Sequence, residues 1–372
     1  MKKYFLIRYI IFFLLFSPGL IWAKAHDEVR IAVLDNLRSQ KLSSVLYENS
    51  YLEGVQAAVL AAKKQGIKIE YKYFKYERGS LDILSKISEI KSWNPDYIIG
   101  PRSSDKFILL KPYFTDVIVV SPLASAKIIT NMPENFYSFS LQDKYIASAV
   151  EKFIKKTFPM QKQMFILSSV DCKSCYEQGN DIIEIYRKTN PSTHIHQQLF
   201  FSDKVEEIDL SESVSSFNKG DIFILPNLSY VSGVLIARIV SHLKMSNLVF
   251  IGTDGWAGSR VSYVGKIQSS LPFTAYHLSQ WPIEIETEQS TKFKNNFHEK
   301  FNKEPTEAIS FASYSVVMAA VDSFTRAKND ISAREKIFNN FKIVAKKYKS
   351  KQYAVYKQDQ HGEKLVTVIN FQ

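Results

Sequence analysis

The chain contains two cysteines, Cys172 and Cys175, three positions apart in the segment "SSVDCKSCYEQG". A C-x-x-C pair can act as a redox centre, contribute to a metal site or close a disulfide across a loop. A zinc site needs about four ligands, and the sequence has no second C-x-x-C or H-x3-H group; His194 and His196 lie in an apparent strand with no cysteine nearby. We therefore expect no metal and no cofactor, and the spacing alone leaves the other roles open.

Five polar loops, each directly after a predicted strand, carry the residue types that bind small molecules. They are rich in Gly, Ser, Asp or Tyr, and none is hydrophobic. In open parallel sheets, ligands bind beyond the carboxyl ends of the strands, in the loops that lead into helices. We therefore expect a ligand site where these segments meet: "GPRSSD", "SPLAS", "SVDCKSCYEQG", "PNLSY" and "GTDGWAGS".

Short apolar runs alternate with amphipathic stretches, which predicts alternating strands and helices and hence a parallel sheet covered on both faces. The alternation breaks at "PENFYSFSLQDKYI" and then restarts, so we predict two α/β lobes. The first predicted strand is 29–34, and the predicted helices are 51–64, 81–93, 105–114, 145–157, 177–188, 206–217 and 230–244.

The first 25 residues have the order of a cleavable signal peptide. Basic residues precede the short apolar run 10–16, and the small-residue pattern Ala23-Lys24-Ala25 follows. The run is shorter than the ~20 residues of a membrane-spanning helix, so we predict export with cleavage after Ala25, or after Ala23. We identify no later run of transmembrane length and expect a soluble mature protein in the periplasm.

The basic charge of the chain does not indicate nucleic-acid binding. Removing residues 1–25 lowers the formal net charge from +11 to +7, and the remaining lysines are scattered. No nucleic-acid motif accompanies them, and an exported protein would rarely meet nucleic acid. We also find no Ser-His-Asp arrangement in the strand-end loops, so we do not expect an enzyme of that kind.

Five segments, in order, resemble the type I periplasmic solute-binding proteins of the branched-chain amino acid (Leu/Ile/Val-binding) class. Two departures stand out: Glu177 replaces the first Gly of the Y-G-x-G loop, and Ser315 stands where Asp is usual. The segments are "IIGPRSS" (98–104), "VVSPLAS" (119–125), "CYEQG" (175–179), "FIGTDGW" (250–256) and the helix "FNKEPTEAISFASYSVVMAAVDSF" (301–324).

The resemblance implies two doubly wound, Rossmann-like lobes joined by a three-crossover hinge, with ligand held between them when the hinge closes. We expect the crossovers near 139–145, 271–282 and 343–352. Lobe one would comprise 27–139 plus 274–345, and lobe two 140–273 plus 346–372.

The resemblance also implies ligand contacts for an amino acid. Ser104 matches a carboxylate-binding serine, although it could equally cap the following helix; Leu123, Ala124 and Ser125 match further polar contacts. Asp254 would pair with the ligand ammonium, whose burial needs a carboxylate, or could merely stabilise its own turn. Tyr176 matches an aromatic residue that covers the ligand, or fills the core. Tyr230 is offset from the family pattern, and Asn227 replaces a Gly there. Trp256 would pack on the ligand or only on the hinge, and Arg102 would select an anionic ligand side chain or lie solvated.

These inferences predict a periplasmic binding protein that captures a small polar solute, an amino acid or related amide, for an inner-membrane ABC permease. A periplasmic sensor that reports to a membrane receptor is the alternative with the same fold. In an oxidising compartment the cysteines favour a disulfide, and a clamp on the Tyr176 loop is our first interpretation. A redox-responsive switch, incidental thiols and a thiol–disulfide oxidoreductase remain open.

Overall fold

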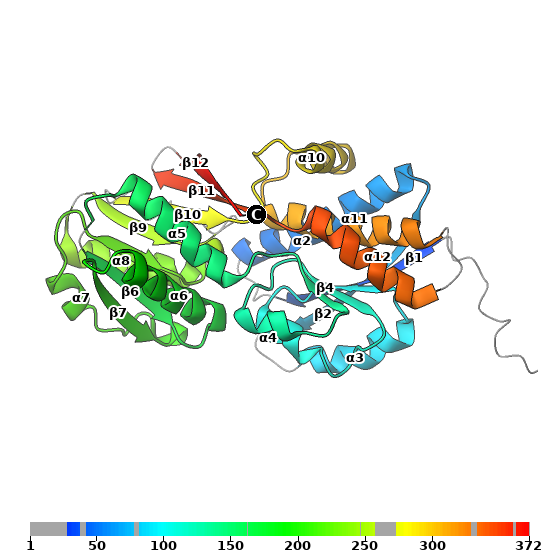
Figure 1. Ribbon diagram of the computed structural model, residues 1–372, viewed down its shortest axis with the longest axis horizontal. Helices are drawn as coiled ribbons and strands as arrows, with labels where there is room; N and C mark the ends of the chain where they lie inside the picture. The colour runs from blue at the N-terminus through cyan, green and yellow to red at the C-terminus, as the bar shows by residue number, and fades with distance from the viewer. Residues whose placement is uncertain are drawn as a thin grey trace, which may run out of the picture.

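Two separate β-sheets, each covered by helices, form the two lobes of the protein (Figure 1). The structure is a computed structural model that describes residues 28–37, 42–77, 82–161, 163–245, 247–256, 273–328, 333–359 and 362–371. The expected signal peptide, residues 1–25, lies outside the described residues. The expected fold class, two doubly wound α/β lobes, is confirmed.

The sheet of the first lobe is parallel and has the strand order β2-β1-β3-β4-β5. Alternate residues of its strands pack into different cores. Ile31 and Val33 pack towards α2 (Leu42–Lys64) and α11 (Ala308–Lys328), while Ala32 and Leu34 pack towards α3 (Asp82–Trp93). This two-sided burial explains the continuous apolar runs. The elements are β1 (Glu28–Leu37), α2 (Leu42–Lys64), β2 (Lys68–Glu77), α3 (Asp82–Trp93), β3 (Tyr97–Ile99), α4 (Ser104–Leu109), β4 (Ile118–Ser121) and β5 (Phe136–Ser138).

The sheet of the second lobe has the order β12-β11-β10-β9-β8-β6-β7, antiparallel only where β11 and β12 join its edge. Phe165 and Leu167 pack with α8 on one face, and Met164 and Ile166 pack with α5 and α6 on the other. The elements are α5 (Asp143–Thr157), β6 (Gln163–Ser169), α6 (Lys173–Thr189), β7 (His194–Phe200), α7 (Ser211–Ser215), β8 (Ile222–Leu225), α8 (Ser229–Leu243), β9 (Leu248–Gly252), β10 (Phe273–Ser279), β11 (Gln352–Asp359) and β12 (Gly362–Asn370).

The described chain passes between the two sheets at three places, 139–142, 280–287 and 349–351. Between the second and third of these, α10 (Glu288–Phe301), α11 (Ala308–Lys328) and α12 (Ala333–Tyr348) return to the first lobe (Figure 1). The predicted lobe boundary at 273/274 falls at the start of β10, and the chain leaves the second sheet only after Ser279.

Two predicted helices are shorter than expected. The helix predicted at 105–114 ends at Leu109, since Pro112 disfavours helical backbone in the residue before it. The helix predicted at 206–217 is reduced to Ser211–Ser215. There the Asp209 carboxylate accepts the Ser211 backbone N–H at 2.9 Å, so local side-chain bonding starts the helix late.

A third correction concerns α11, because Ala308–Ala327 is long and apolar enough by length and composition to cross a membrane. The expectation that no run after residue 25 approaches transmembrane length was therefore wrong. Most of this segment, 78%, is buried inside the protein, where α11 packs against α2 and α12. Its apolar character is accounted for by burial on several sides in the core of the first lobe.

The close contact between α2 and α11 depends on Gly54. A Cβ on this residue would lie 2.0 Å from the Ser310 carbonyl oxygen and 2.1 Å from Ser313 Oγ. We expect Gly54→Ala to lower the free energy of unfolding by roughly 3 kcal/mol, because two helix backbones must separate. Urea unfolding would measure this.

Gly66 supplies the control for that substitution. Its φ is +75°, and a Cβ there would meet nothing within 4 Å. Gly66→Ala should therefore cost only the left-handed backbone term of about 1 kcal/mol. If Gly54→Ala were no more destabilising than Gly66→Ala, the close helix contact would not matter for stability.

Candidate functional site

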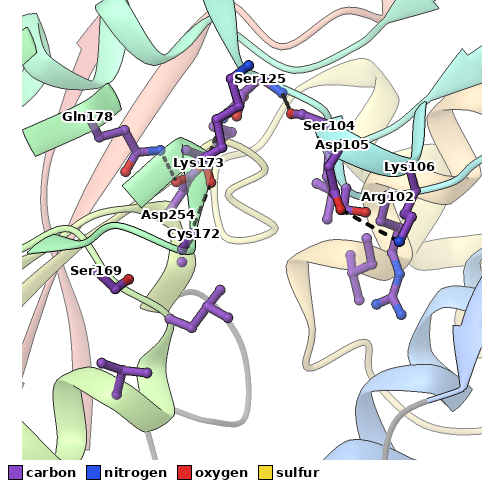
Figure 2. A pocket seen from close by; sticks show the side chains of 18 of the residues that line it. Arg102, Ser104, Asp105, Lys106, Ser125, Ser169, Cys172, Lys173, Gln178 and Asp254 are labelled. Carbon is purple, nitrogen blue, oxygen red and sulfur yellow. Dashed lines mark hydrogen bonds and ion pairs between the residues drawn. The ribbon is translucent and has the colours of Figure 1, made fainter. Parts of the chain in front are cut away.

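A cavity of about 550 Å³ lies between the lobes and is lined by residues of both. This volume lies in the range of small-molecule sites. Figure 2 shows Arg102, Ser104 and Lys106 of the first lobe on one side of the open space and Ser169, Cys172 and Asp254 of the second lobe on the other.

The first-lobe wall is built where the loops after β3 and β4 meet. The Ser104 hydroxyl oxygen accepts the backbone N–H groups of Ser125 and Ala126, each at 3.1 Å. These bonds use its lone pairs and leave its own proton to donate into the cleft. The alternative role of Ser104 as a helix cap is not observed, since Ser103 occupies the N-cap position of α4 and makes no side-chain cap bond.

Arg102 lines the same wall but is buried and ion-paired. Its Nε lies 2.6 Å from Asp35 Oδ1, with the two side chains 6% and 0% exposed. Tyr73 donates its hydroxyl to Asp35 Oδ2 at 3.0 Å, and burial together with Asp35 raises the pKa of Tyr73, which keeps it a neutral donor. The guanidinium charge therefore meets a fixed carboxylate in the protein, and the solvated-loop interpretation of Arg102 is wrong.

Asp254 is the central group of the second-lobe wall, directly after β9. Gln178 Nε2 donates to Asp254 Oδ1 at 3.2 Å, and Gln280 Nε2 donates to Oδ2 at 2.8 Å. Desolvation raises the pKa of Asp254, while both amide bonds oppose that shift. Two amide donors from different elements thus fix the orientation of a carboxylate that faces the cavity (Figure 2).

A second carboxylate, Asp143, lies behind Asp254 at the start of α5. Gln178 Nε2 also donates to Asp143 Oδ1, at 3.0 Å, so one amide group bridges two acids. Burial, reinforced by the charge of Asp254, raises the pKa of Asp143 to about 7. Burial therefore holds back the ionisation of both acids behind the cleft, and the charge of Asp254 holds back that of Asp143 further.

Cys172 and Cys175 form a disulfide in the structure, with their Cα atoms 5.2 Å apart. Cys172 is the N-cap of α6, where its sulfur accepts the Cys175 N–H at 3.4 Å. Cys172 lines the cavity, whereas Cys175 is buried. The bond therefore lies at the edge of the cleft, between β6 and α6.

Of the residues predicted for the site, the structure brings Arg102, Ser104, Leu123, Ser125 and Asp254 together around the cavity. Five others do not line it.

Three of those five are held inside their own lobes. Ala124 is buried; its N–H donates to Ser121 Oγ, and its carbonyl accepts a hydrogen bond from the Ser138 hydroxyl. The Asn227 side chain, which follows β8, is hydrogen-bonded to β6. Its Oδ1 accepts the Ser169 N–H, and its Nδ2 donates to the Leu167 carbonyl. Trp256 is fully buried beside Gly252 and donates Nε1–H to Ser232.

The two tyrosines, Tyr176 and Tyr230, lie outside the cavity lining, 39% and 48% exposed. Each belongs to the first turn of a helix, α6 or α8, that follows a strand of the second sheet. In this arrangement of the lobes neither ring covers the cavity.

Sequence reasoning missed Gln178, Gln280, Asp143 and Lys106. Gln178 lies inside the quoted segment "CYEQG", and Gln280 directly follows a strand, so the strand-end criterion covers both. Neither glutamine matches a ligand-contacting position of the family pattern, which is the criterion that selected the amide Asn227. Asp143 and Lys106 are helix residues, and only burial distinguishes them from solvated charges.

Solved structures match the fold over more than nine-tenths of the chain. A leucine-binding protein from Thermotoga maritima has a TM-score of 0.73 at 17% identity, covering 92% of this chain and 99% of that one. A branched-chain amino acid transporter substrate-binding protein from Streptococcus pneumoniae, in complex with isoleucine, has a TM-score of 0.71 at 14% identity, covering 92% and 99%.

A solute-binding protein from R. palustris, in complex with 4-hydroxybenzoate, has a TM-score of 0.72 at 11% identity, covering 93% of this chain and 98% of that one. No family model matches the sequence. No curated protein matches it either. Of these three, the R. palustris protein is described as a solute-binding protein of an ABC transporter. This chain has the fold of the type I periplasmic binding proteins.

Proposed function

We propose that the protein is an exported solute-binding protein that captures an amino acid or a related amide by cleft closure and delivers it to an inner-membrane ABC permease. The observation that carries the proposal is a hydroxyl donor and a fixed carboxylate that line one cavity from different lobes. The Ser104 hydroxyl belongs to the first-lobe wall and the Asp254 carboxylate to the second-lobe wall.

A zwitterionic ligand fits this polarity. Its carboxylate would accept the Ser104 hydroxyl, whose oxygen is already held by two backbone N–H groups. Its ammonium would lie against Asp254, because burying an ammonium needs a carboxylate partner. Closure of the hinge would bring the two walls onto the two ends of one small molecule.

Aromatic carboxylates are a second candidate class, because structures with this fold bind benzoate and 4-hydroxybenzoate. Such ligands lack an ammonium and would leave Asp254 without a charged partner. A sensor role would use the same cleft, and genes for a permease and an ATPase, or for a kinase, beside this one would separate the two roles.

Removing the Asp254 charge is the direct test of the amino acid class. We expect L-leucine, L-isoleucine or L-glutamine to raise the melting temperature of the mature wild-type protein by mass action. Asp254→Asn should weaken that binding by roughly 10- to 150-fold, the size of one hydrogen bond to a charged group. Calorimetric titration would give the two dissociation constants.

Asp171→Asn is the matched control, since Asp171 also lines the cavity but is bonded to the Ser202 backbone N–H at 2.8 Å. It should leave the affinity for the amino acid nearly unchanged. If benzoate or 4-hydroxybenzoate binds wild type and Asp254→Asn equally, while amino acids do not bind, the amino acid proposal is wrong.

A further inference from the structure

Gln280 connects the cleft to the hinge. It is the first residue after β10 and is 4% exposed. Its side-chain Nε2 donates to Asp254 Oδ2 at 2.8 Å, while its Oε1 accepts the Leu141 backbone N–H at 2.7 Å. One planar amide thus holds the cleft carboxylate at one end and the first crossover at the other.

The backbone of Gln280 extends the same connection to the third crossover. Its carbonyl accepts the Ser350 hydroxyl at 2.6 Å, and the Ser350 N–H donates to the Phe139 carbonyl at 3.1 Å. Residues 139–142, 280–287 and 349–351 are therefore tied together at the point where Gln280 begins the second crossover.

We propose that Gln280 is a positioning residue that couples occupation of Asp254 to the opening and closing of the cleft. The inference rests on the proposed function, because it takes Asp254 as the group that meets the ligand. Hinge motions are absorbed by a few residues between elements, and a ligand shifts such an equilibrium only through interactions that differ between the open and closed states. The two ends of the Gln280 amide supply such an interaction.

The negative charge of Asp254 explains how ligand binding would change the Gln280 hydrogen bonds. A ligand ammonium beside Asp254 draws the carboxylate towards the cavity and weakens its acceptance of the Gln280 N–H. The amide is then free to follow Leu141 as the first crossover changes its backbone angles. Without ligand, the carboxylate, amide and crossover stay locked in one arrangement.

Gln178 offers a matched comparison. It is also a buried glutamine, and its Nε2 also donates to Asp254, at 3.2 Å. Its other partner is Asp143 in α5, and no bond of its side chain reaches the three crossovers in the described residues. Replacing either glutamine with methionine, which has a similar length, removes one donor to Asp254, but only Gln280→Met also releases Leu141.

The experiment measures the distance between spin labels on the two lobes by pulsed electron resonance, without ligand and with L-leucine. Labels go on Lys111→Cys in the first lobe and Lys204→Cys in the second, both exposed. The two native cysteines are joined in a disulfide and will not react with the label. Circular dichroism melting checks that every variant is folded.

We expect Gln280→Met to broaden the ligand-free distance distribution, and Gln178→Met to leave it as in wild type. Gln280→Glu keeps an oxygen for the Leu141 N–H but replaces the donor to Asp254 with a second carboxylate, whose repulsion should release the Asp254 end of the lock. Its ligand-free distribution should therefore be broader than that of wild type, and L-leucine should no longer change it as it changes wild type. This variant also keeps the test valid if Gln280→Met does not fold.

The proposal is overturned if Gln280→Met and Gln178→Met give the same ligand-free distribution, or if L-leucine still changes the distribution of Gln280→Glu as it changes that of wild type. If L-leucine changes no distribution, including that of wild type, the proposed ligand class has failed. The ligand-free comparison of the two methionine variants still decides the role of Gln280 in the hinge.

Discussion

Replacing Arg102 with methionine is expected to lower the free energy of unfolding by roughly 3–5 kcal/mol, the usual cost of breaking a buried ion pair from one side. The reason is the environment of Asp35, which is 0% exposed and lies 2.6 Å from the Arg102 Nε. Methionine fills much of the same space, but it leaves a buried carboxylate without the guanidinium. Urea unfolding at neutral pH measures the loss.

Asp35→Asn in the Arg102→Met background is the control, because it removes the uncompensated charge. We expect it to restore part of the lost stability, since the carbonyl oxygen of the substituted amide can still accept a hydrogen bond from Tyr73. If Arg102→Met is nearly as stable as wild type and instead abolishes binding of an anionic amino acid such as L-glutamate, Arg102 selects the ligand, as the sequence suggested.

Asp143 is expected to make the protein less stable as the pH rises. Its pKa in the folded protein is about 7, against 3.8 for the unperturbed group, so between these values the folded state holds a proton that the unfolded state has lost. Stability contributed by this group is therefore lost as the pH rises from about 4 to above 7, by up to roughly 4 kcal/mol. Asp143→Asn cannot ionise and lacks this dependence.

The measurement is urea unfolding of wild type and Asp143→Asn at several pH values from 4.5 to 8. The difference in unfolding free energy should grow with pH in favour of the asparagine variant. Asp209→Asn is the control, because the hydrogen bond from the Ser211 side chain lowers the pKa of Asp209, so its asparagine variant should gain no advantage as the pH rises. Parallel pH profiles for wild type and Asp143→Asn would mean that Asp143 ionises in the folded protein as easily as in the unfolded chain.

The two-lobe α/β fold was predictable because it depends on patterns within short segments. Runs such as Tyr97–Ile99 and Ile222–Leu225 are apolar throughout, and in the structure all their residues are buried. Within each lobe the loops after parallel strands gather at one edge of the sheet, which places Ser104 beside Ser125 and puts Asp254 at the edge of the other sheet. The alternation of elements carries this information without any long-range contact. The resemblance to the type I periplasmic solute-binding proteins supplied the expectation that the two edges share one site.

The sequence could not tell which polar residues face the cavity and which serve the lobes internally. Asn227 and Trp256 follow strands like Asp254 does, but their side chains bond to Ser169, Leu167 and Ser232. The position of a residue in a strand-end loop determines at which end of the sheet the residue lies. The direction of its side chain depends on hydrogen-bonding and packing partners from elements that are distant in the sequence.

The sequence by itself determined the order of strands and helices, the two-lobe architecture and the edge where polar groups gather. Tertiary structure alone decided that Arg102 pairs with Asp35, that Gln178 bridges Asp143 and Asp254, and that Gln280 joins Asp254 to Leu141. The physical reason is that the spacing of apolar residues within a short segment is enough to specify a strand or a helix. Burial and pairing of a charged or amide group depend on partners brought together only when the lobes and their crossovers are assembled.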